Sequence, residues 1–319
     1  IIKTPTDPNK TFSDDPLRML RAIRFSCELN FDINTETQNS IKKNSNRLEI
    51  LSSERISDEI NKILMSQTPS NGFRNLEKFN LLNPILPELI DLKGVEEVEG
   101  QTHKDNFYHT LEVVDNISRN TENVWLRWAA LLHDVGKAPT KKFSKKIGWT
   151  FHGHEFIGSK MVKKIFTRLS LPLNEKLKYV QKIVMMSSRP IIISEDIVTD
   201  SAVRRLIYDA GNDIDDLLTL CEADITTKNM KKTLIYQNNF KIVRQKIKDV
   251  EERDSIRNFQ PPITGEIIMA YFNIKPCKEI GLIKEKIKNA ILDGDIRNDY
   301  NEAHDLMVKT GKSLGLKDE

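Results

Sequence analysis

Apolar residues recur along this chain mainly at helical spacing, and the strict alternation that indicates β-strands is scarce. Near the start of the chain, Leu17, Leu20 and Ile23 share one apolar face, and Pro16 suits the first turn of that helix. The pattern over the first hundred residues therefore predicts several short helices.

Two later segments carry the clearest helical patterns. The run "VWLRWAALL" at 124–132 is almost entirely apolar and predicts a buried helix. In "EIGLIKEKIKNAILDG" at 279–294, one face is apolar and Gly294 ends the pattern. That face consists of Ile280, Ile283, Ile287, Ala290 and Ile291. The predicted fold class is all-α and multi-helical.

Turn-forming stretches divide the chain into three predicted parts. "LLNPILPEL" and the acidic "GVEEVEG" close a first part over 1–100, and the paired prolines of "NFQPPITGE" open a third part over 259–319. The second part, 101–258, lies between them.

Composition adds little beyond excluding some protein classes. The 319 residues include 49 Lys and Arg against 46 Asp and Glu, a net charge of +3, so the local placement of charge matters more than its sum. Apolar runs stay shorter than the roughly 18 residues that span a bilayer. The three cysteines are far apart and form no CxxC pair, which argues against a disulfide framework or a cysteine zinc site. We expect a cytoplasmic protein.

Histidine and aspartate are concentrated in the second part. Five of the six histidines fall between 103 and 154, and His133 and Asp134 are adjacent at the end of the apolar run. His109 and Asp224 could complete a site of two imidazoles and two carboxylates. Such ligands suit Mn, Fe, Co, Ni, Zn or Mg and do not select among them. The alternative is that His133 and Asp134 cap a helix and His109 is an ordinary core residue.

This spacing resembles the HD superfamily of metal-dependent phosphohydrolases over residues 101–230. The resemblance implies that Lys137 in "HDVGK" contacts a substrate phosphate and that His152 and His154 could join a second metal. Relatives often carry a further histidine where this chain has Ser187, which weighs against the second metal.

A charged stripe lies beside the first apolar face. Asp15, Arg18, Arg21 and Arg24 are three residues apart in "SDDPLRMLRAIRF", which we read as one short helix beginning at residues 13–15. A carboxylate accepts and a guanidinium donates hydrogen bonds, so Asp15 and Arg18 could match the edge of cytosine or adenine. The alternative is that Asp15 is a helix cap and Arg18 a surface residue.

The stretch "TFSDDPLRMLRAIRF" resembles the nucleotide-templating motif of bacterial CCA-adding enzymes, the tRNA nucleotidyltransferases of the poly(A) polymerase family. Two later segments, which begin "TDSAVRRLIYDAGND" and "QPPITGEIIMAYF", resemble the body and tail of the subgroup with an HD domain. The resemblance implies that Asp15 and Arg18 select CTP and then ATP, and that tRNA is the partner. "LSSERISDEINKIL" resembles the helix that braces the template, where Arg55 and Glu59 are spaced to pair. The three parts then become a neck, an HD domain running into body helices, and a tRNA-binding tail.

The same resemblance implies a catalytic head with a pair of metal-binding aspartates, and this sequence contains no candidate for them. We expect the head to precede residue 1 and the chain alone to add no nucleotides. Two other functions stay open. The HD site could be a phosphatase or 2′,3′-cyclic phosphodiesterase acting on RNA ends or nucleotides, or the chain could be a noncatalytic RNA-binding module with a structural metal.

Overall fold

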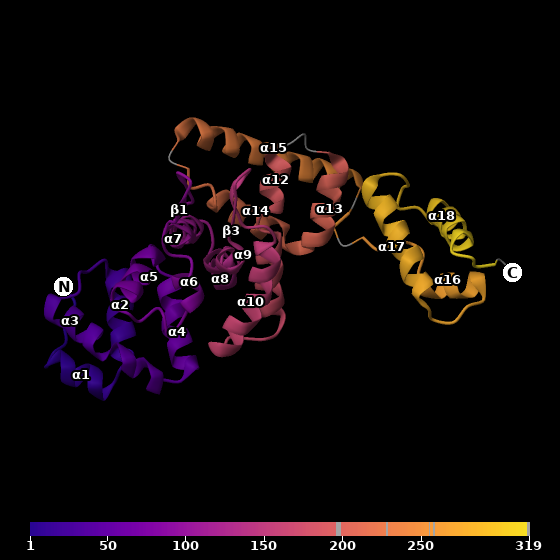
Figure 1. Ribbon diagram of the computed structural model, residues 1–319. Coiled ribbons are helices and arrows are strands. Elements are labelled where there is room, and N and C mark those ends of the chain that lie inside the picture. Colours follow the sequence, from indigo (N-terminus) through magenta and orange to yellow (C-terminus); the bar gives the residue numbers. More distant parts are fainter. Residues whose placement is uncertain (196–198, 228, 255, 258, 318–319) are drawn as a thin grey trace. The chain divides into compact units, whose positions relative to one another are not determined.

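The computed structural model describes residues 1–195, 199–227, 229–254, 256–257 and 259–317 (Figure 1). Helices dominate these residues, which confirms the all-α prediction. Two short antiparallel hairpins are the exception. One pairs β1 (Glu97–Val98) with β2 (Gln101–Thr102), and the other pairs β3 (Lys142–Ser144) with β4 (Gly148–Thr150).

Contacts divide the described chain into two compact units. The first unit contains Ile1–Ser188 and Asp215–Leu234, and the second contains Arg189–Ile214 and Ile235–Glu319. The three predicted parts have other boundaries and stay predictions.

The first unit begins with short helices. A buried apolar face of α2, including Leu20 and Ile23, packs on neighbouring helices. Their bounds are α1 (Pro8–Asp14), α2 (Leu17–Leu29), α3 (Thr35–Asn44), the 3₁₀ helix η1 (Ser45–Ile50), α4 (Ser53–Leu64), α5 (Pro69–Lys78) and α6 (Pro87–Ile90).

The predicted single helix around Pro16 is wrong in one respect. Asp14 ends α1, and Asp15 adopts an extended backbone with φ −139° and ψ 91° before α2 begins at Leu17. A residue that precedes proline is disfavoured in the helical region, so the break falls at Asp15. Its carboxylate accepts a hydrogen bond from Leu17 N at 3.3 Å and so caps α2.

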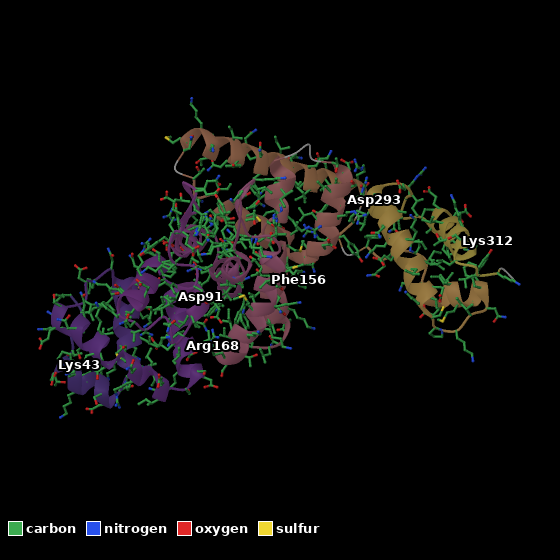
Figure 2. The ribbon with its side chains drawn as sticks, viewed as in Figure 1. Lys43, Asp91, Phe156, Arg168, Asp293 and Lys312 are labelled. Atoms are coloured by element: carbon green, nitrogen blue, oxygen red, sulfur yellow. The ribbon has the colours of Figure 1, made fainter. Side chains whose placement is uncertain are left out.

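The remaining helices of the first unit also bury apolar side chains. The predicted helix at 124–132 is confirmed as α8 (Val124–Leu132), whose residues Leu126–Leu132 are all buried. The others are α7 (Asn106–Ser118), α9 (Lys137–Thr140), α10 (His154–Arg168), α11 (Glu175–Met186) and α14 (Ile214–Ala223). Arg168, labelled in Figure 2, ends α10 and bonds both carboxylate oxygens of Glu88, at 2.8 and 2.5 Å.

A buried arginine joins these two groups of helices. Arg127 on α8 is 2 % exposed, and its guanidinium donates to the carbonyls of Leu64, Ser66, Ser118 and Thr121 at 2.9–3.0 Å. These carbonyls lie just after the ends of α4 and α7 or within their last turns, where helical partners are lacking. One side chain therefore satisfies the ends of two helices.

The second unit is also helical. The predicted helix at 279–294 is confirmed as α17 (Lys278–Asp293), and Gly294 ends it with φ +83°. The other elements are α12 (Arg189–Glu195), α13 (Asp200–Ala210), η2 (Gly211–Asp213), α16 (Gly265–Phe272) and α18 (Tyr300–Ser313), and α15 (Met230–Asp254) continues from the first unit's residues. Among the described residues, no helix is long and apolar enough to cross a membrane.

Candidate metal centre and templating pair

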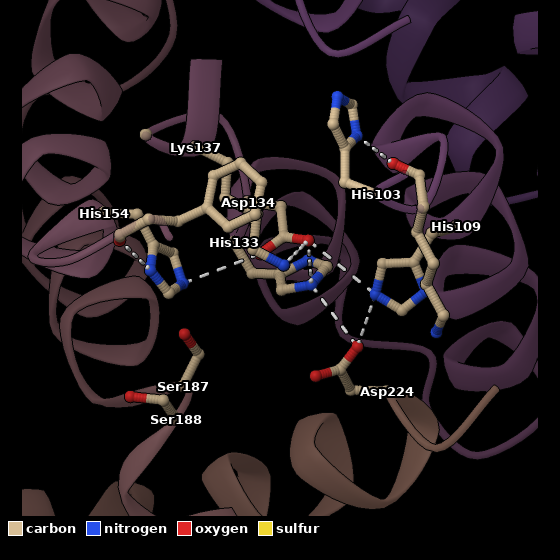
Figure 3. Close-up of polar contacts among 12 residues, drawn as sticks. His103, His109, His133, Asp134, Lys137, His154, Ser187, Ser188 and Asp224 are labelled. Carbon is tan, nitrogen blue, oxygen red and sulfur yellow. Dashed lines mark hydrogen bonds and ion pairs between the residues drawn. The ribbon is translucent and has the colours of Figure 1, made fainter. Parts of the chain in front are cut away.

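Three helices of the first unit bring the predicted metal ligands together. His109 lies on α7, His133 and Asp134 follow the last residue of α8, and Asp224 follows α14. Figure 3 shows His109 and Asp224 facing the His133–Asp134 pair. Ligand atoms of His109, His133 and Asp224 lie within 4.8 Å of one another, so a single ion could contact all three.

Asp134, the fourth predicted ligand, also lies close to both histidines. Its Oδ2 lies 3.4 Å from His133 Nε2 and 3.7 Å from His109 Nε2. Lys137 Nζ donates to the same oxygen at 2.7 Å, so the lysine expected at a substrate phosphate contacts a carboxylate of the site.

The histidine rings are oriented by bonds on their far sides. His133 Nδ1 donates to Ala130 O at 2.8 Å, since a carbonyl can only accept, and this leaves Nε2 facing the carboxylates. His109 Nδ1 bonds Thr226 Oγ1 at 2.9 Å. Metal-ligating histidines are typically held in this way. The sequence analysis missed this contact of Thr226, because a threonine two residues after Asp224 carries no distinguishing pattern.

Two buried atoms of the group have no hydrogen-bond partner: His133 Nε2 and Asp224 Oδ1. Burial opposes charge on His133, but Asp134 and Asp224 more than offset it and raise the pKa of the imidazole to about 9. Burial also opposes charge on Asp224, yet His109 and His133 hold the pKa of that carboxyl well below its usual range. A positive charge is thus favoured between these side chains. Imidazole nitrogens and carboxylate oxygens together are ligands that fit a divalent cation.

The residues that bear on a second metal, His152, His154 and Ser187, do not lie as close together as the four predicted ligands do. His154 Nε2 lies 3.8 Å from Asp134 Oδ1, and its Nδ1 bonds Phe151 O at 3.0 Å. His152 is exposed in the turn before α10. Ser187 is buried and donates to Val184 O. Of these three residues, only His154 has a recorded contact with a carboxylate of the group.

The pair predicted to select nucleotides, Asp15 and Arg18, lies elsewhere in the first unit. Arg18 Nε lies 3.5 Å from Asp15 Oδ2, and the two side chains are 53 % and 31 % exposed. Arg55 Nη2 on α4 lies 3.6 Å from Asp15 Oδ1. Asp15 therefore caps α2 and also faces two arginines at the surface.

The expected pairing of Arg55 with Glu59 is wrong, because the structure gives each a different partner. Glu59 is buried, and its carboxylate lies 3.4 Å from Arg24 Nε, 3.7 Å from Arg21 Nε and 3.3 Å from Lys62 Nζ. α4 still contacts the charged stripe at two points. Arg55 contacts Asp15, and Glu59 contacts Arg21 and Arg24.

Comparison with known families matches two segments of the chain. Residues 30–92 match the family described as a probable RNA- and SrmB-binding site of polymerase A, and residues 106–229 match the HD domain. The second match contains every predicted metal ligand.

Curated relatives extend the likeness over most of the chain. It is 28 % identical over 291 residues to the A-adding tRNA nucleotidyltransferase of Deinococcus radiodurans, covering 88 % of this chain and 65 % of that protein. It is 37 % identical over 168 residues to the multifunctional CCA protein of Shewanella frigidimarina, covering 50 % and 40 %. The chain thus spans less than two thirds of the length of these relatives.

A solved structure shares the fold. The CCA-adding enzyme of Bacillus stearothermophilus, solved with CTP, aligns with a TM-score of 0.67 at 16 % identity, over 98 % of this chain and 66 % of that one. The two matched families and the curated relatives agree: the chain contains an HD domain and a segment of the polymerase A RNA-binding family, and over most of its length it is similar to a tRNA nucleotidyltransferase.

Proposed function

We propose that this chain is the neck, HD domain, body and tail of a tRNA nucleotidyltransferase that adds all or part of the CCA end, and that Asp15 and Arg18 select the incoming nucleotide. The observation that carries the proposal is the pair itself. A carboxylate and a guanidinium lie side by side at the surface, with Arg55 against the carboxylate. The names of the relatives support the reaction.

The chemistry of the pair suits base selection. The Asp15 carboxylate accepts from the exocyclic amine of cytosine or adenine, and Arg18 donates to the neighbouring ring acceptor. A base with a carbonyl at the amine position places an acceptor against an acceptor, so uracil and guanine are disfavoured. ATP and CTP are the proposed substrates.

The transfer step itself requires carboxylates that this sequence does not supply, so the chain alone is proposed to add no nucleotides. The test uses protein made from the complete reading frame and measures CMP and AMP incorporation into tRNA lacking its CCA end. Asp15→Ala should abolish incorporation or admit UMP and GMP. Exposed Asp58→Asn on α4 is the matched control and should keep wild-type selection. Unchanged selection in Asp15→Ala would contradict the proposal.

tRNA is the proposed partner, held by basic helical surfaces of the last third through phosphate and shape contacts. Such binding releases counterions, so its affinity should fall steeply as salt rises. A cytoplasmic location fits this substrate and the three free cysteines.

The partnerless atoms His133 Nε2 and Asp224 Oδ1 support a second activity, metal-dependent phosphohydrolysis at the HD site. A divalent cation bound there supplies a Lewis acid and lowers the pKa of a bound water. His109, His133, Asp134 and Asp224 would hold it. The reaction would convert a phosphate monoester and water into an alcohol and inorganic phosphate, or a 2′,3′-cyclic phosphate and water into a phosphate monoester with one free hydroxyl.

This second activity is tested by phosphate release from RNA ending in a 3′ phosphate, with Mn²⁺, Ni²⁺ or Mg²⁺ added separately. His133→Asn should abolish release, whereas His304→Asn in the second unit should not. Circular dichroism checks that both variants are folded. Release that persists in folded His133→Asn places the activity elsewhere, and absence of release with any of these metals favours a structural role for the ion.

A further inference from the structure

The outer face of α10 carries lysines that no acidic side chain neutralises. Lys160, Lys163 and Lys164 are exposed on this helix, which Figure 2 marks by Phe156 near its start and Arg168 at its end. In the part of the chain that the structure describes, none of these three lysines forms an ion pair. Their positive charges are therefore open to an anionic partner.

Lysines in and beside the β3–β4 hairpin differ in this respect. Lys141 pairs with Glu96, and Lys145 Nζ lies 3.5 Å from Glu99 Oε1. A surface that carries its own counter-charges attracts an anionic partner less strongly, so this hairpin is an ordinary solvated surface. Helices α10 and α11 together contain seven Lys and Arg residues against two Glu, so their surface keeps an excess of positive charge.

The neighbouring helix extends the basic face of α10. Residues 169–174 join α10 to α11, and the two helices pack as an antiparallel pair. Ser159 Oγ donates to Gln181 O at 3.0 Å, and Gln181 Nε2 donates to Ser159 O at 2.8 Å, which fixes the two helices against each other. Lys163 and exposed Lys178 both lie about one turn from this contact, in the direction of the loop. Lys178 therefore continues the row of lysines onto α11.

Apolar side chains lie at the other end of the same face. Phe156 is 48 % exposed and Met185 is 43 % exposed, and each lies about one turn from the Ser159–Gln181 contact, away from the loop. Lys160 Nζ lies 3.9 Å from the centroid of the Phe156 ring. An exposed aromatic ring beside several lysines suits a single-stranded nucleic acid, because a base stacks on the ring while the ammonium groups contact phosphates.

The chemistry of this face favours one class of nucleic acid. Bases in a duplex are stacked on one another, so only an unpaired base can stack on Phe156. Lysine is a flexible point charge that contacts phosphates without the planar, bidentate geometry that reads a base edge. RNA is favoured over DNA because residues 30–92 of the same chain match an RNA-binding family.

We infer that the outer face of α10 and α11 binds single-stranded RNA without regard to its sequence. Lys160, Lys163 and Lys164 contact phosphates of the strand. Lys178 extends this row, and Phe156 stacks on a base. The face contains none of the four predicted metal ligands and is separate from the surfaces of the last third proposed to hold tRNA. The inference therefore rests on neither proposed activity.

The experiment measures the anisotropy of fluorescein-labelled decauridylate with the 319-residue chain over a range of salt concentrations. Lys160→Gln/Lys163→Gln/Lys164→Gln should weaken binding about tenfold at low salt. It should also reduce the slope of log affinity against log salt concentration by about 2, since each phosphate contact on a single strand contributes about 0.7. Phe156→Leu should weaken binding about fivefold and leave the slope unchanged, because stacking releases no counterions. Phe156→Tyr should preserve the affinity.

The matched control removes three exposed lysines from the hairpin. Lys142→Gln/Lys145→Gln/Lys146→Gln changes the net charge by the same amount as the α10 triple variant and should keep the wild-type affinity and slope. Circular dichroism checks that every variant is folded. A folded tRNA and a decaglutamate peptide are measured as competitors with the wild-type chain and with the α10 triple variant.

Equal slopes for the wild type and the α10 triple variant overturn the inference, as does an equal loss of affinity in the hairpin control. Loss of tRNA binding in the α10 variant with unchanged decauridylate binding would assign this face to structured RNA. Decaglutamate that competes as well as RNA would assign it to an acidic protein. Either of these results overturns the assignment to single-stranded RNA.

Discussion

His109 Nε2 and Asp224 Oδ1 lie 2.8 Å apart, closer than any other contact between the histidines and carboxylates of the metal group. The contact helps to hold the pKa of the Asp224 carboxyl well below its usual range, so the ionised carboxylate is favoured beside this imidazole. The ring of His109 is held from behind by Thr226, so it cannot turn away from Asp224 without breaking that bond. The relationship therefore depends on a residue outside the predicted ligand set.

Replacing Thr226 with valine should lower the affinity for a divalent metal by about tenfold, because loss of an outer partner leaves the ligating imidazole free to rotate. Isothermal titration with Mn²⁺ or Ni²⁺ measures the change. Thr226→Ser keeps the hydroxyl and should retain wild-type affinity. If valine and serine bind metal equally well, the hydroxyl has no part in orienting His109.

The sequence predicted the elements whose patterns are local. The apolar run of α8 and the amphipathic face of α17 appear as helices close to the expected bounds, because period and end signals lie within the segments themselves. The sequence also predicted that His109, His133, Asp134 and Asp224 lie together, since buried His and Asp side chains at the ends of apolar helices need partners. Metal binding by this group stays a prediction.

Features that depend on packing between helices could not be predicted in this way. Arg55 contacts Asp15 and not Glu59, because the approach of α4 to α2 decides the partner and spacing along α4 does not. Thr226 was missed for the same reason. The break at Asp15 has a local signal, because the following proline disfavours a helical backbone at the residue before it.

The buried Arg127 predicts a large loss of stability on substitution. Arg127→Met removes donors from the carbonyls of Leu64, Ser66, Ser118 and Thr121 and should lower the free energy of unfolding by about 3 kcal/mol or more, since each buried acceptor left unpaired is costly. Urea unfolding measures this. Exposed Arg119→Met, at the end of α7, is the control and should have little effect. Similar stabilities for the two variants would show that the carbonyls find other donors.

The second unit contains a pH-dependent contribution to stability at Asp254. Arg253 and Arg204 bond its carboxylate at 2.7–3.0 Å and lower the pKa of Asp254 to about 2. Because the folded pKa lies below the ordinary value of 3.8, the stabilisation is complete above that value and disappears as pH falls through about 2. Asp254→Asn should therefore lower the melting temperature at pH 7, with a smaller difference from wild type at pH 3.

Thermal melts of both proteins between pH 7 and pH 3 check this dependence. Asp305→Asn, on the exposed side of α18, is the control and should follow the wild type throughout. A difference between Asp254→Asn and wild type that stays constant across this pH range would mean that the contribution comes from packing and not from charge.

The glycine in "HDVGK" is required by the close approach of two backbones. A Cβ on Gly136 would lie 2.0 Å from His154 O and 2.7 Å from Gly158 N, and backbone atoms cannot turn aside as a side chain would. Gly136→Ala should therefore displace the start of α10, which carries His154, and lower both the melting temperature and the metal affinity. Gly281→Ala is the matched control, because its Cβ meets nothing within 4 Å inside α17 and alanine favours a helix by about 0.5–1 kcal/mol. That variant should melt at or above the wild-type temperature. If Gly136→Ala also melts as the wild type does and binds metal normally, α10 can move away from Gly136 at no cost, and its position does not support the metal centre.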